Sequence, residues 1–279
     1  MPHVYTNGIV TFYEDAGDGP AVVLIHGYGA DLRLWDAQVP ALAGAGFRVI
    51  RYDVRGHGRS LIPPDGYTYE NYAADLRDLL DRINVERPAT ESLGVEAAHL
   101  VGLSMGGGIA LRFALDFPER VLSLTLIDSA LPGFSYSNET SGRIEEFVSA
   151  VRADGPRAAI ENIWLRHPFF DGVRRSPEQF ELVRQIVLGF QAPDMRDGAR
   201  PTDYRPDIAD RLSGVRAPTL VVAGEHDIPD FRLIADLLSE NLPQARLFVM
   251  PDCWHLPPVE KPAELNRILI EFLRDVSRH

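Results

Sequence analysis

The chain has 279 residues, of which 45% are hydrophobic, so its size predicts one large domain with a sizeable insertion. The formal net charge of −12 argues against a nucleic-acid partner. The single cysteine, Cys253, excludes an intrachain disulfide and fits a reducing compartment, so we expect a cytoplasmic protein.

Neither a targeting segment nor a membrane span is expected. Residues 1–17 lack the basic start and apolar run of a signal peptide. The most apolar window, residues 98–115, is interrupted by His99, Ser104, Arg112 and several glycines, which argue against insertion into a bilayer. We therefore expect a soluble protein.

Strand-like and helix-like segments alternate along the chain. A loose alternation broken by Asn7-Gly8 predicts an antiparallel hairpin over residues 4–14. Strand-length apolar runs follow at residues 21–25, 47–52, 98–102, 122–127, 219–223 and 245–250. Helices are predicted at residues 34–43 and 69–83, from residue 106 to about residue 115, and at 262–276. A further helix is predicted after Asp227 and ends near residue 238. This alternation predicts an α/β sheet with parallel crossovers and helices on both faces.

The strand-like runs stop between residues 132 and 205. Helical stretches at residues 143–152, 157–165 and 177–188 replace them, rich in aromatics and separated by Pro, Gly and Asp. We interpret residues 132–205 as a helical cap inserted into a core made of residues 1–131 and 206–279.

Ser104 stands where a predicted strand meets a predicted helix. Gly102 and Gly106 complete the pattern G-x-S-x-G, which leaves room for a strained turn that exposes the hydroxyl beside a helix N-terminus. A serine hydroxyl is a poor nucleophile unless a base takes its proton and a third group orients that base. The pattern predicts a nucleophile elbow, and a glycine-rich buried helix is the other interpretation.

Five pieces stand in one order along the chain: HGYG at 26–29, DVRGHGRS at 53–60, GLSMGG at 102–107, GEHD at 224–227 and the late His255. In these pieces and their order the chain resembles the α/β-hydrolase fold family over nearly its whole length. The resemblance implies a mostly parallel, twisted sheet with helices on both faces and an inserted helical cap.

The resemblance also implies a catalytic triad in the order Ser, Asp, His. Each candidate follows a parallel strand, and the carboxyl ends of such strands share one edge of the sheet. Ser104 is the candidate nucleophile, His255 the general base and Asp227 the acid. Asp128, after the preceding strand, is the alternative acid, although we expect it rather to accept turn hydrogen bonds where the cap begins.

Two backbone N–H groups are expected to form the oxyanion hole. They belong to Tyr28, in the first loop, and to Met105, directly after the nucleophile. Because His255 must be unprotonated to act as a base, activity is expected to rise with pH through one ionisation near neutrality.

The other polar residues of the motifs are interpreted as structural. His26 and His57 are expected to support their loops, and Asp53 and Arg55 to brace a loop as a paired charge. Cys253 is interpreted as a packed small side chain rather than a reactive thiol. The histidine spacing lacks H-E-x-x-H, and P-loop, G-x-G-x-x-G and calcium-loop patterns are missing, so no metal and no cofactor is predicted.

Aromatic side chains predict a mostly apolar pocket between the sheet edge and the cap. Its candidate lining residues are Trp35, Phe134, Tyr136, Trp164, Phe169, Phe170, Phe190 and Leu256. Together they indicate a small, partly apolar substrate with little or no charge.

The resemblance implies acyl transfer through an acyl-enzyme on a carboxylic ester or lactone. Serine at position 104 disfavours haloalkane dehalogenase and epoxide hydrolase activity, which use aspartate there. A carbon–carbon bond hydrolase or a cofactor-free perhydrolase of the same fold is an alternative. A triad-containing small-molecule receptor with little turnover is the alternative from another class. We expect no nucleic-acid or membrane partner and a monomer or homodimer.

Overall fold

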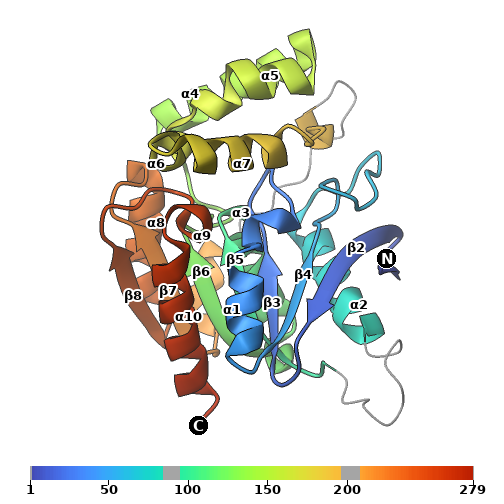
Figure 1. Ribbon diagram of the computed structural model, residues 1–279, viewed down its shortest axis with the longest axis vertical. Helices are drawn as coiled ribbons and strands as arrows, with labels where there is room; N and C mark the ends of the chain where they lie inside the picture. The colour runs from blue at the N-terminus through green and yellow to red at the C-terminus, as the bar shows by residue number, and fades with distance from the viewer. Residues whose placement is uncertain (1, 84–94, 196–207, 279) are drawn as a thin grey trace.

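A computed structural model describes residues 2–83, 95–195 and 208–278. An eight-stranded sheet runs through the molecule in the order β1-β2-β4-β3-β5-β6-β7-β8 (Figure 1). The strands are β1 (His3–Thr6), β2 (Ile9–Ala16), β3 (Ala21–Ile25), β4 (Arg48–Tyr52), β5 (Ala98–Leu103), β6 (Val121–Ile127), β7 (Thr219–Gly224) and β8 (Ala245–Met250). The pairs from β4 to β8 are parallel, whereas β1 pairs with β2, and β2 with β4, in antiparallel fashion. The predicted mostly parallel α/β sheet is confirmed.

Helices cover both faces of this sheet. The α-helices are α1 (Gln38–Gly44), α2 (Tyr69–Ile83), α3 (Met105–Asp116), α4 (Asn138–Asp154), α5 (Pro156–Asn162), α6 (Asp171–Arg174), α7 (Pro177–Val187), α8 (Pro229–Asn241), α9 (Pro257–Glu260) and α10 (Pro262–Val276). Short 3₁₀ turns are η1 (Leu32–Trp35), η2 (Pro118–Arg120), η3 (Trp164–Arg166), η4 (Pro168–Phe170), η5 (Pro193–Met195) and η6 (Ala209–Gly214). Among the described helices, none has the length and apolar character needed to cross a bilayer.

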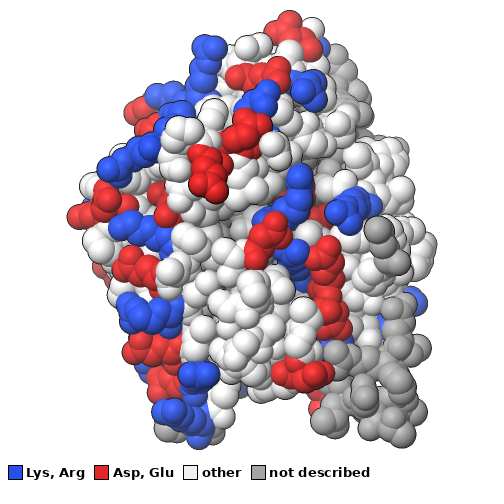
Figure 2. All heavy atoms as spheres, viewed as in Figure 1, with Lys and Arg blue, Asp and Glu red and all other residues white. Residues whose placement is uncertain are grey.

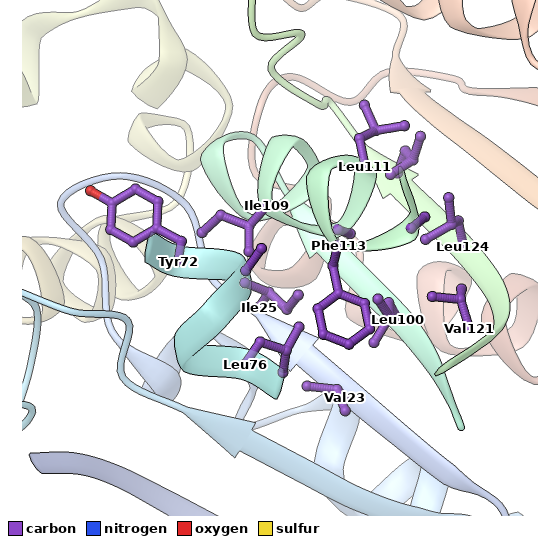
Figure 3. Close-up of a cluster of buried hydrophobic side chains, with 14 of the residues drawn as sticks. Val23, Ile25, Tyr72, Leu76, Leu100, Ile109, Leu111, Phe113, Val121 and Leu124 are labelled. Carbon is purple, nitrogen blue, oxygen red and sulfur yellow. The ribbon is translucent and has the colours of Figure 1, made fainter. Parts of the chain in front are cut away.

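The side chains of β3 alternate between two buried clusters. Val23 and Ile25 pack against α2 and α3 in the cluster drawn in Figure 3, whereas Val22 and Leu24 face the cluster that contains residues of α1 and α10. All four side chains are fully buried. This alternation with a period of two residues explains why a continuous apolar run forms a central strand, since both of its faces are covered.

Helices α4 to α7 lie between β6 and β7 in the chain and above one edge of the sheet (Figure 1). We refer to residues 138–195 as the helical cap; the expected boundary at 205/206 lies outside the described residues. Phe147 and Val183 of the cap join the same buried cluster as α10. The predicted helix over 157–165 instead ends at Asn162, and the 3₁₀ turn η3 follows it, capped at its end by His167, which Pro168 holds in an extended conformation.

The surface charges are mixed. In Figure 2, Lys and Arg side chains lie among Asp and Glu side chains over α10, β8 and the cap helices. Two of these pairs are Arg267 with Glu271 and Arg246 with Asp275. Over the described part of this face, the opposite charges are interspersed, a distribution unlike the basic stripe of a nucleic-acid-binding protein.

Candidate active site

Ser104 lies at the bend between β5 and α3, in a backbone conformation that is rare for any residue other than glycine, with φ at +52°. Its backbone N–H donates to the carbonyl of Ile127 at 2.9 Å. Its own carbonyl accepts from the N–H groups of Gly107 and Ala130, each at 2.9 Å. These bonds to α3 and to the end of β6 hold the strained turn in place.

The two glycines of the pattern are required by close backbone approach. A Cβ atom on Gly102 would lie 2.3 Å from the carbonyl oxygen of Gly106. A Cβ atom on Gly106 would lie 2.2 Å from the carbonyl oxygen of Ile25, at the end of β3. No side chain fits at either position, so the turn that presents Ser104 depends on both glycines.

Asp227 and His255 meet at the same edge of the sheet. Asp227 follows β7 and His255 follows β8, and the Nδ1–H of His255 donates to Oδ2 of Asp227 at 2.7 Å. The other oxygen of Asp227 accepts the backbone N–H of Ile228 at 2.7 Å. Both side chains are buried. Because the Nδ1 proton is engaged by an aspartate, the Nε2 atom of His255 is left as the proton acceptor.

Ser104 and His255 line one small cavity of about 60 Å³. Within the described residues, no hydrogen bond joins the Ser104 hydroxyl to the imidazole, and such contacts are often long until a substrate binds. The ring of Phe169 stacks on the imidazole with centroids 3.9 Å apart, and that of Phe231 packs edge-on at 4.7 Å. These rings confine the imidazole from two sides.

The burial of His255 changes its protonation behaviour. Loss of hydration lowers the pKa of the imidazole below its ordinary value of 6.5, although the nearby Glu260 carboxylate acts to raise it. At neutral pH the ring is therefore uncharged, which is the form that accepts a proton.

Glu260 of α9 holds the loop that carries His255, a role that motif matching did not find. Its Oε2 accepts the N–H of Trp254 and its Oε1 the N–H of Leu256, both at 2.8 Å. These are the residues on either side of His255. A glutamate in the first turn of a helix just after the histidine is the signal that could have found this contact.

Asp128 reaches the neighbouring strand rather than a turn of the cap, which corrects the expectation from the sequence. Its Oδ1 accepts the N–H of Gly224, at the end of β7, at 2.8 Å. One oxygen each of Asp128 and Asp227 and one ring nitrogen of His255 lie within 4.8 Å of one another. These three atoms are a donor set that a cation can use. His255, however, hydrogen-bonds Asp227 directly, which is the contact expected if Asp227 is the acid of the triad.

The two candidate oxyanion donors lie beside Ser104. Tyr28 and Met105 line a second cavity, of about 260 Å³, together with Ser104. Neither of their backbone N–H groups has an acceptor within the described part of the chain, and Met105, as the first residue of α3, has none inside its helix. Both donors are therefore available to a ligand.

Two buried histidines support the loops near Tyr28. The Nε2 atom of His57 accepts the N–H of Gly29 at 3.1 Å, and that of His26 accepts the N–H of Val54 at 3.0 Å. Burial lowers the pKa of both imidazoles, so each is a neutral acceptor. This is the structural role expected of them.

The expected pairing of Asp53 with Arg55 does not form. Asp53 instead accepts the N–H groups of Leu32 and Arg59, each at 2.8 Å. Arg55 forms a buried ion pair with Asp75 of α2, at 2.7 Å. Neighbouring positions in a loop point their side chains in different directions, so closeness in sequence did not give the partner.

The two cavities differ in character. The small one is lined by Gly27, Tyr28, Ala30, Leu34, Leu103, Ser104, Trp164, Phe169, Phe170, Val183, Ile186, Val187, His255 and Leu256. The larger one is lined by Tyr28, Tyr67, Tyr69, Tyr72, Ser104, Met105, Ala130, Tyr136, Thr140, Ile144, Trp164, Phe169, Asp194, Met195 and Phe231. Aliphatic side chains dominate the first, and tyrosines with one carboxyl group distinguish the second.

Five of the eight predicted pocket residues line these cavities: Tyr136, Trp164, Phe169, Phe170 and Leu256. The other three lie outside both linings: Trp35, Phe134 and Phe190. Trp35 is fully buried in the core, Phe134 packs edge-on against Tyr136, and Phe190 stacks on His57. Position along the chain does not determine which way an aromatic ring points.

A sheet in this strand order, with a strained serine after β5, an aspartate after β7 and a histidine after β8, defines the α/β-hydrolase class. The chain matches the α/β hydrolase fold family over residues 20–262 and belongs to it.

Its relatives within that family have varied activities. It is 33% identical to a protein assigned as carbamate hydrolase RutD in Variovorax paradoxus, covering 95% of this chain and 96% of that one. It is 32% identical to a 2-hydroxy-6-oxononadienedioate/2-hydroxy-6-oxononatrienedioate hydrolase of Burkholderia vietnamiensis, covering 94% and 90%. Among solved structures, a thermophilic esterase from Thermogutta terrifontis is 30% identical, with a TM-score of 0.81 and 99% of each chain covered.

Proposed function

We propose that this protein is a serine hydrolase of neutral carboxylic esters or lactones, with Ser104 as nucleophile, His255 as general base and Asp227 as the acid that orients it. The observation that carries the proposal is that the His255–Asp227 hydrogen bond and the strained Ser104 turn border the same small cavity. Ser104 and His255 line this cavity, Asp227 binds the imidazole, and the three residues follow three strands of the parallel part of the sheet.

The reaction proceeds by two acyl transfers. The Oγ atom of Ser104 bonds to the substrate carbonyl carbon while its proton passes to Nε2 of His255. The carbonyl oxygen becomes an anion that the N–H groups of Tyr28 and Met105 stabilise. The carbon–oxygen bond to the leaving alcohol then breaks, and His255 returns the proton to that alcohol. Water repeats the sequence on the acyl-enzyme and releases the acid.

The two cavities support an assignment of the two halves of the substrate. Because the leaving alcohol takes its proton from His255, it must lie on the side of Ser104 that faces this imidazole. His255 lines the small, aliphatic cavity, whereas Met105 lines the larger one. The alcohol portion is therefore small, and the acyl portion occupies the tyrosine-lined cavity.

Charge favours a neutral substrate. Of the residues that the structure describes, those lining the two cavities include no Lys or Arg, and the larger cavity carries the carboxyl group of Asp194. A substrate carboxylate there would be buried without a cation and beside a like charge, which is costly. This argues against substrates of the dioate type, named for the Burkholderia vietnamiensis relative, and hence against the carbon–carbon hydrolase alternative.

A matched pair of isomers tests this proposal. Ethyl phenylacetate carries a large acyl group and a small alcohol, and phenethyl acetate carries the reverse; hydrolysis of each is followed by pH-stat. We expect kcat/KM to be about tenfold or more higher for ethyl phenylacetate, since it fits the two cavities as assigned. Equal rates, or the opposite preference, would overturn the assignment of the cavities.

The same assay, with Ser104→Ala as control, tests the class of activity. We expect the substitution to reduce turnover by roughly 10⁴-fold or more. Short p-nitrophenyl esters, lactones and an aryl carbamate widen the panel, and acetate with hydrogen peroxide tests for peracid formation. A receptor would give one slow acylation without cycling. Absence of turnover on every ester, lactone and carbamate would refute the proposal that the protein is a hydrolase. We place the protein in the cytoplasm, since its single cysteine, Cys253, is free and buried.

A further inference from the structure

Two buried carboxyl groups lie side by side behind the imidazole. Asp128 ends β6 and Asp227 ends the neighbouring strand β7, and their side chains belong to residues that are 1% and 5% exposed. One oxygen from each lies within 4.8 Å of the other and of a ring nitrogen of His255. Two carboxylate charges this close and this buried repel each other strongly, so one of the groups must hold a proton.

The hydrogen bonds decide which carboxyl is ionised. Asp227 accepts two N–H groups, from His255 and from the backbone of Ile228, both at 2.7 Å. Asp128 accepts one, from Gly224, on Oδ1. Its Oδ2 is buried and has no partner in the described part of the molecule. More donors stabilise the anion on Asp227, whereas a protonated Oδ2 on Asp128 would find its acceptor in the adjacent carboxylate.

We propose that Asp128 is a neutral carboxylic acid that donates its Oδ2–H to the carboxylate of Asp227 and thereby fixes the orientation in which Asp227 receives the Nδ1–H of His255. Asp128 is then a positioning residue, two hydrogen bonds away from the imidazole of His255. This inference rests on the proposed function insofar as it gives Asp227 the role of triad acid.

The surroundings support a neutral Asp128. Burial first, and then the charge of Asp227, raise the pKa of the Asp128 carboxyl well above its ordinary range. The other titratable groups that act on the pair are His255, Glu260 and Arg232. Within the described residues no Lys or Arg hydrogen-bonds either carboxyl, so no cation compensates a second negative charge.

Two substitutions at position 128 test the donated hydrogen bond. Asp128→Asn keeps an acceptor for Gly224 and supplies an N–H for Asp227, so it imitates the neutral acid. Asp128→Ala removes both. We expect kcat of Asp128→Ala to fall roughly 10- to 100-fold with KM little changed, and Asp128→Asn to restore most of that loss. Because one uncharged group replaces another, the acid limb of the pH–rate profile of Asp128→Asn is expected to stay in place.

Asp227→Asn is the matched control, since the same chemical change one strand away removes the charge that orients His255. We expect it to lower kcat by roughly 10⁴-fold. If Asp128→Asn were as damaging as Asp227→Asn, Asp128 would be the ionised group and the proposal would fail. It would fail equally if Asp128→Ala kept full kcat, or if the acid limb of Asp128→Asn moved to lower pH.

A stability measurement tests the proton without any turnover. A carboxyl whose pKa is raised by folding keeps a proton that the unfolded chain loses, so stability falls as pH rises above the unfolded pKa. Asp128→Asn has no carboxyl at this position, so its stability does not fall with pH for this reason. Its Tm relative to the wild type is therefore expected to increase from about pH 4.5 to about pH 8. A relative Tm that decreased would show an ionised Asp128, whatever the enzyme's substrate proves to be.

Discussion

The edge of the sheet and the helical cap form opposite sides of the same cavities, but they are held in different ways. At the edge, backbone hydrogen bonds secure Ser104 and the loop of His255, and burial isolates Asp227. The cap contributes mainly rings, among them Trp164 and Phe169, which line both cavities. In the proposed mechanism, the edge supplies the reacting groups, whereas the rings of the cap limit which substrate fits.

One polar contact joins the two regions within the larger cavity. The hydroxyl of Tyr28, whose backbone belongs to the proposed oxyanion hole, donates to Asp194 of the cap at 2.8 Å. The Tyr28 ring also packs edge-on against Trp164 and Phe190. The position of the cap therefore bears directly on the loop that would hold the oxyanion.

The largest effect is expected from an isosteric change at the edge. Asp227→Asn is expected to lower kcat by roughly 10⁴-fold, because an amide cannot stabilise the protonated imidazole or hold its tautomer. The control is Asp230→Asn, three residues on, where the carboxylate instead binds Ser137 at the start of the cap. We expect this control to change kcat only a few-fold, as measured on one ester, with circular dichroism to check folding. Comparable losses in the two variants would remove the distinction between edge and cap.

The pH dependence of the edge should reflect its burial. In the proposed mechanism, activity requires neutral His255 and is lost as pH falls through its pKa, which burial moves below 6.5. We therefore expect log kcat/KM to be level through neutrality and to fall by about one unit per pH unit in the acid range. This shifts the ionisation from the neutral range expected from the sequence. An inflection above pH 6.5, measured with a non-ionising ester, would contradict the effect of burial.

A glycine in the cap tests whether the cap also supports the loop that carries His255 at the edge of the sheet. A Cβ atom on Gly172 of α6 would lie 2.1 Å from Oε2 of Glu260, the oxygen that accepts the N–H of Trp254 beside His255. Gly172→Ala is therefore expected to behave like an edge variant, with kcat reduced roughly 10-fold and KM little changed. Gly142→Ala is the matched control, since a Cβ there meets nothing within 4 Å and improves the helix α4. Equal kinetics for the two variants would show that Glu260 adjusts freely.

The smallest effect is expected from the cap carboxyl. Asp194→Asn removes a negative charge from the larger cavity while keeping an acceptor for Tyr28. We expect kcat/KM for a neutral ester to change within about threefold, and that for an ester bearing a carboxylate to rise about fivefold. Asp154→Asn, at the exposed end of α4, is the control for a change of net charge. A uniform effect on both esters would mean that Asp194 does not select by charge.

The sequence predicted what depends on local pattern. Apolar runs located the strands, and the spacing around Ser104 located the bend, because the period of burial and the need for glycine are local properties. Side-chain partners were less predictable. Arg55 pairs with Asp75 rather than Asp53, and Asp128 binds Gly224, since these contacts arise only when separate strands and helices pack.

The same limit applies to the walls of the cavities. Aromatic content indicated the pocket, but Trp35 points into the core and Phe190 onto His57. Tyr69 and Tyr72 of the larger cavity were missed because they lie on α2, well before the cap in sequence. Only the packing of α2 beside α3 brings them near Ser104.

The chain leaves the sheet after β6 and returns to it at β7, and these strands are adjacent, with Ile127 paired to Val222. The two points at which the chain leaves the sheet and rejoins it are therefore adjacent, on two strands that pair directly with each other. Because these ends are adjacent, a helical segment of different length or sequence can join them without changing the strand order of the sheet. Exchange of this segment among homologous enzymes is therefore a direct route to new selectivity, provided that its contacts to His255 and Tyr28 are kept.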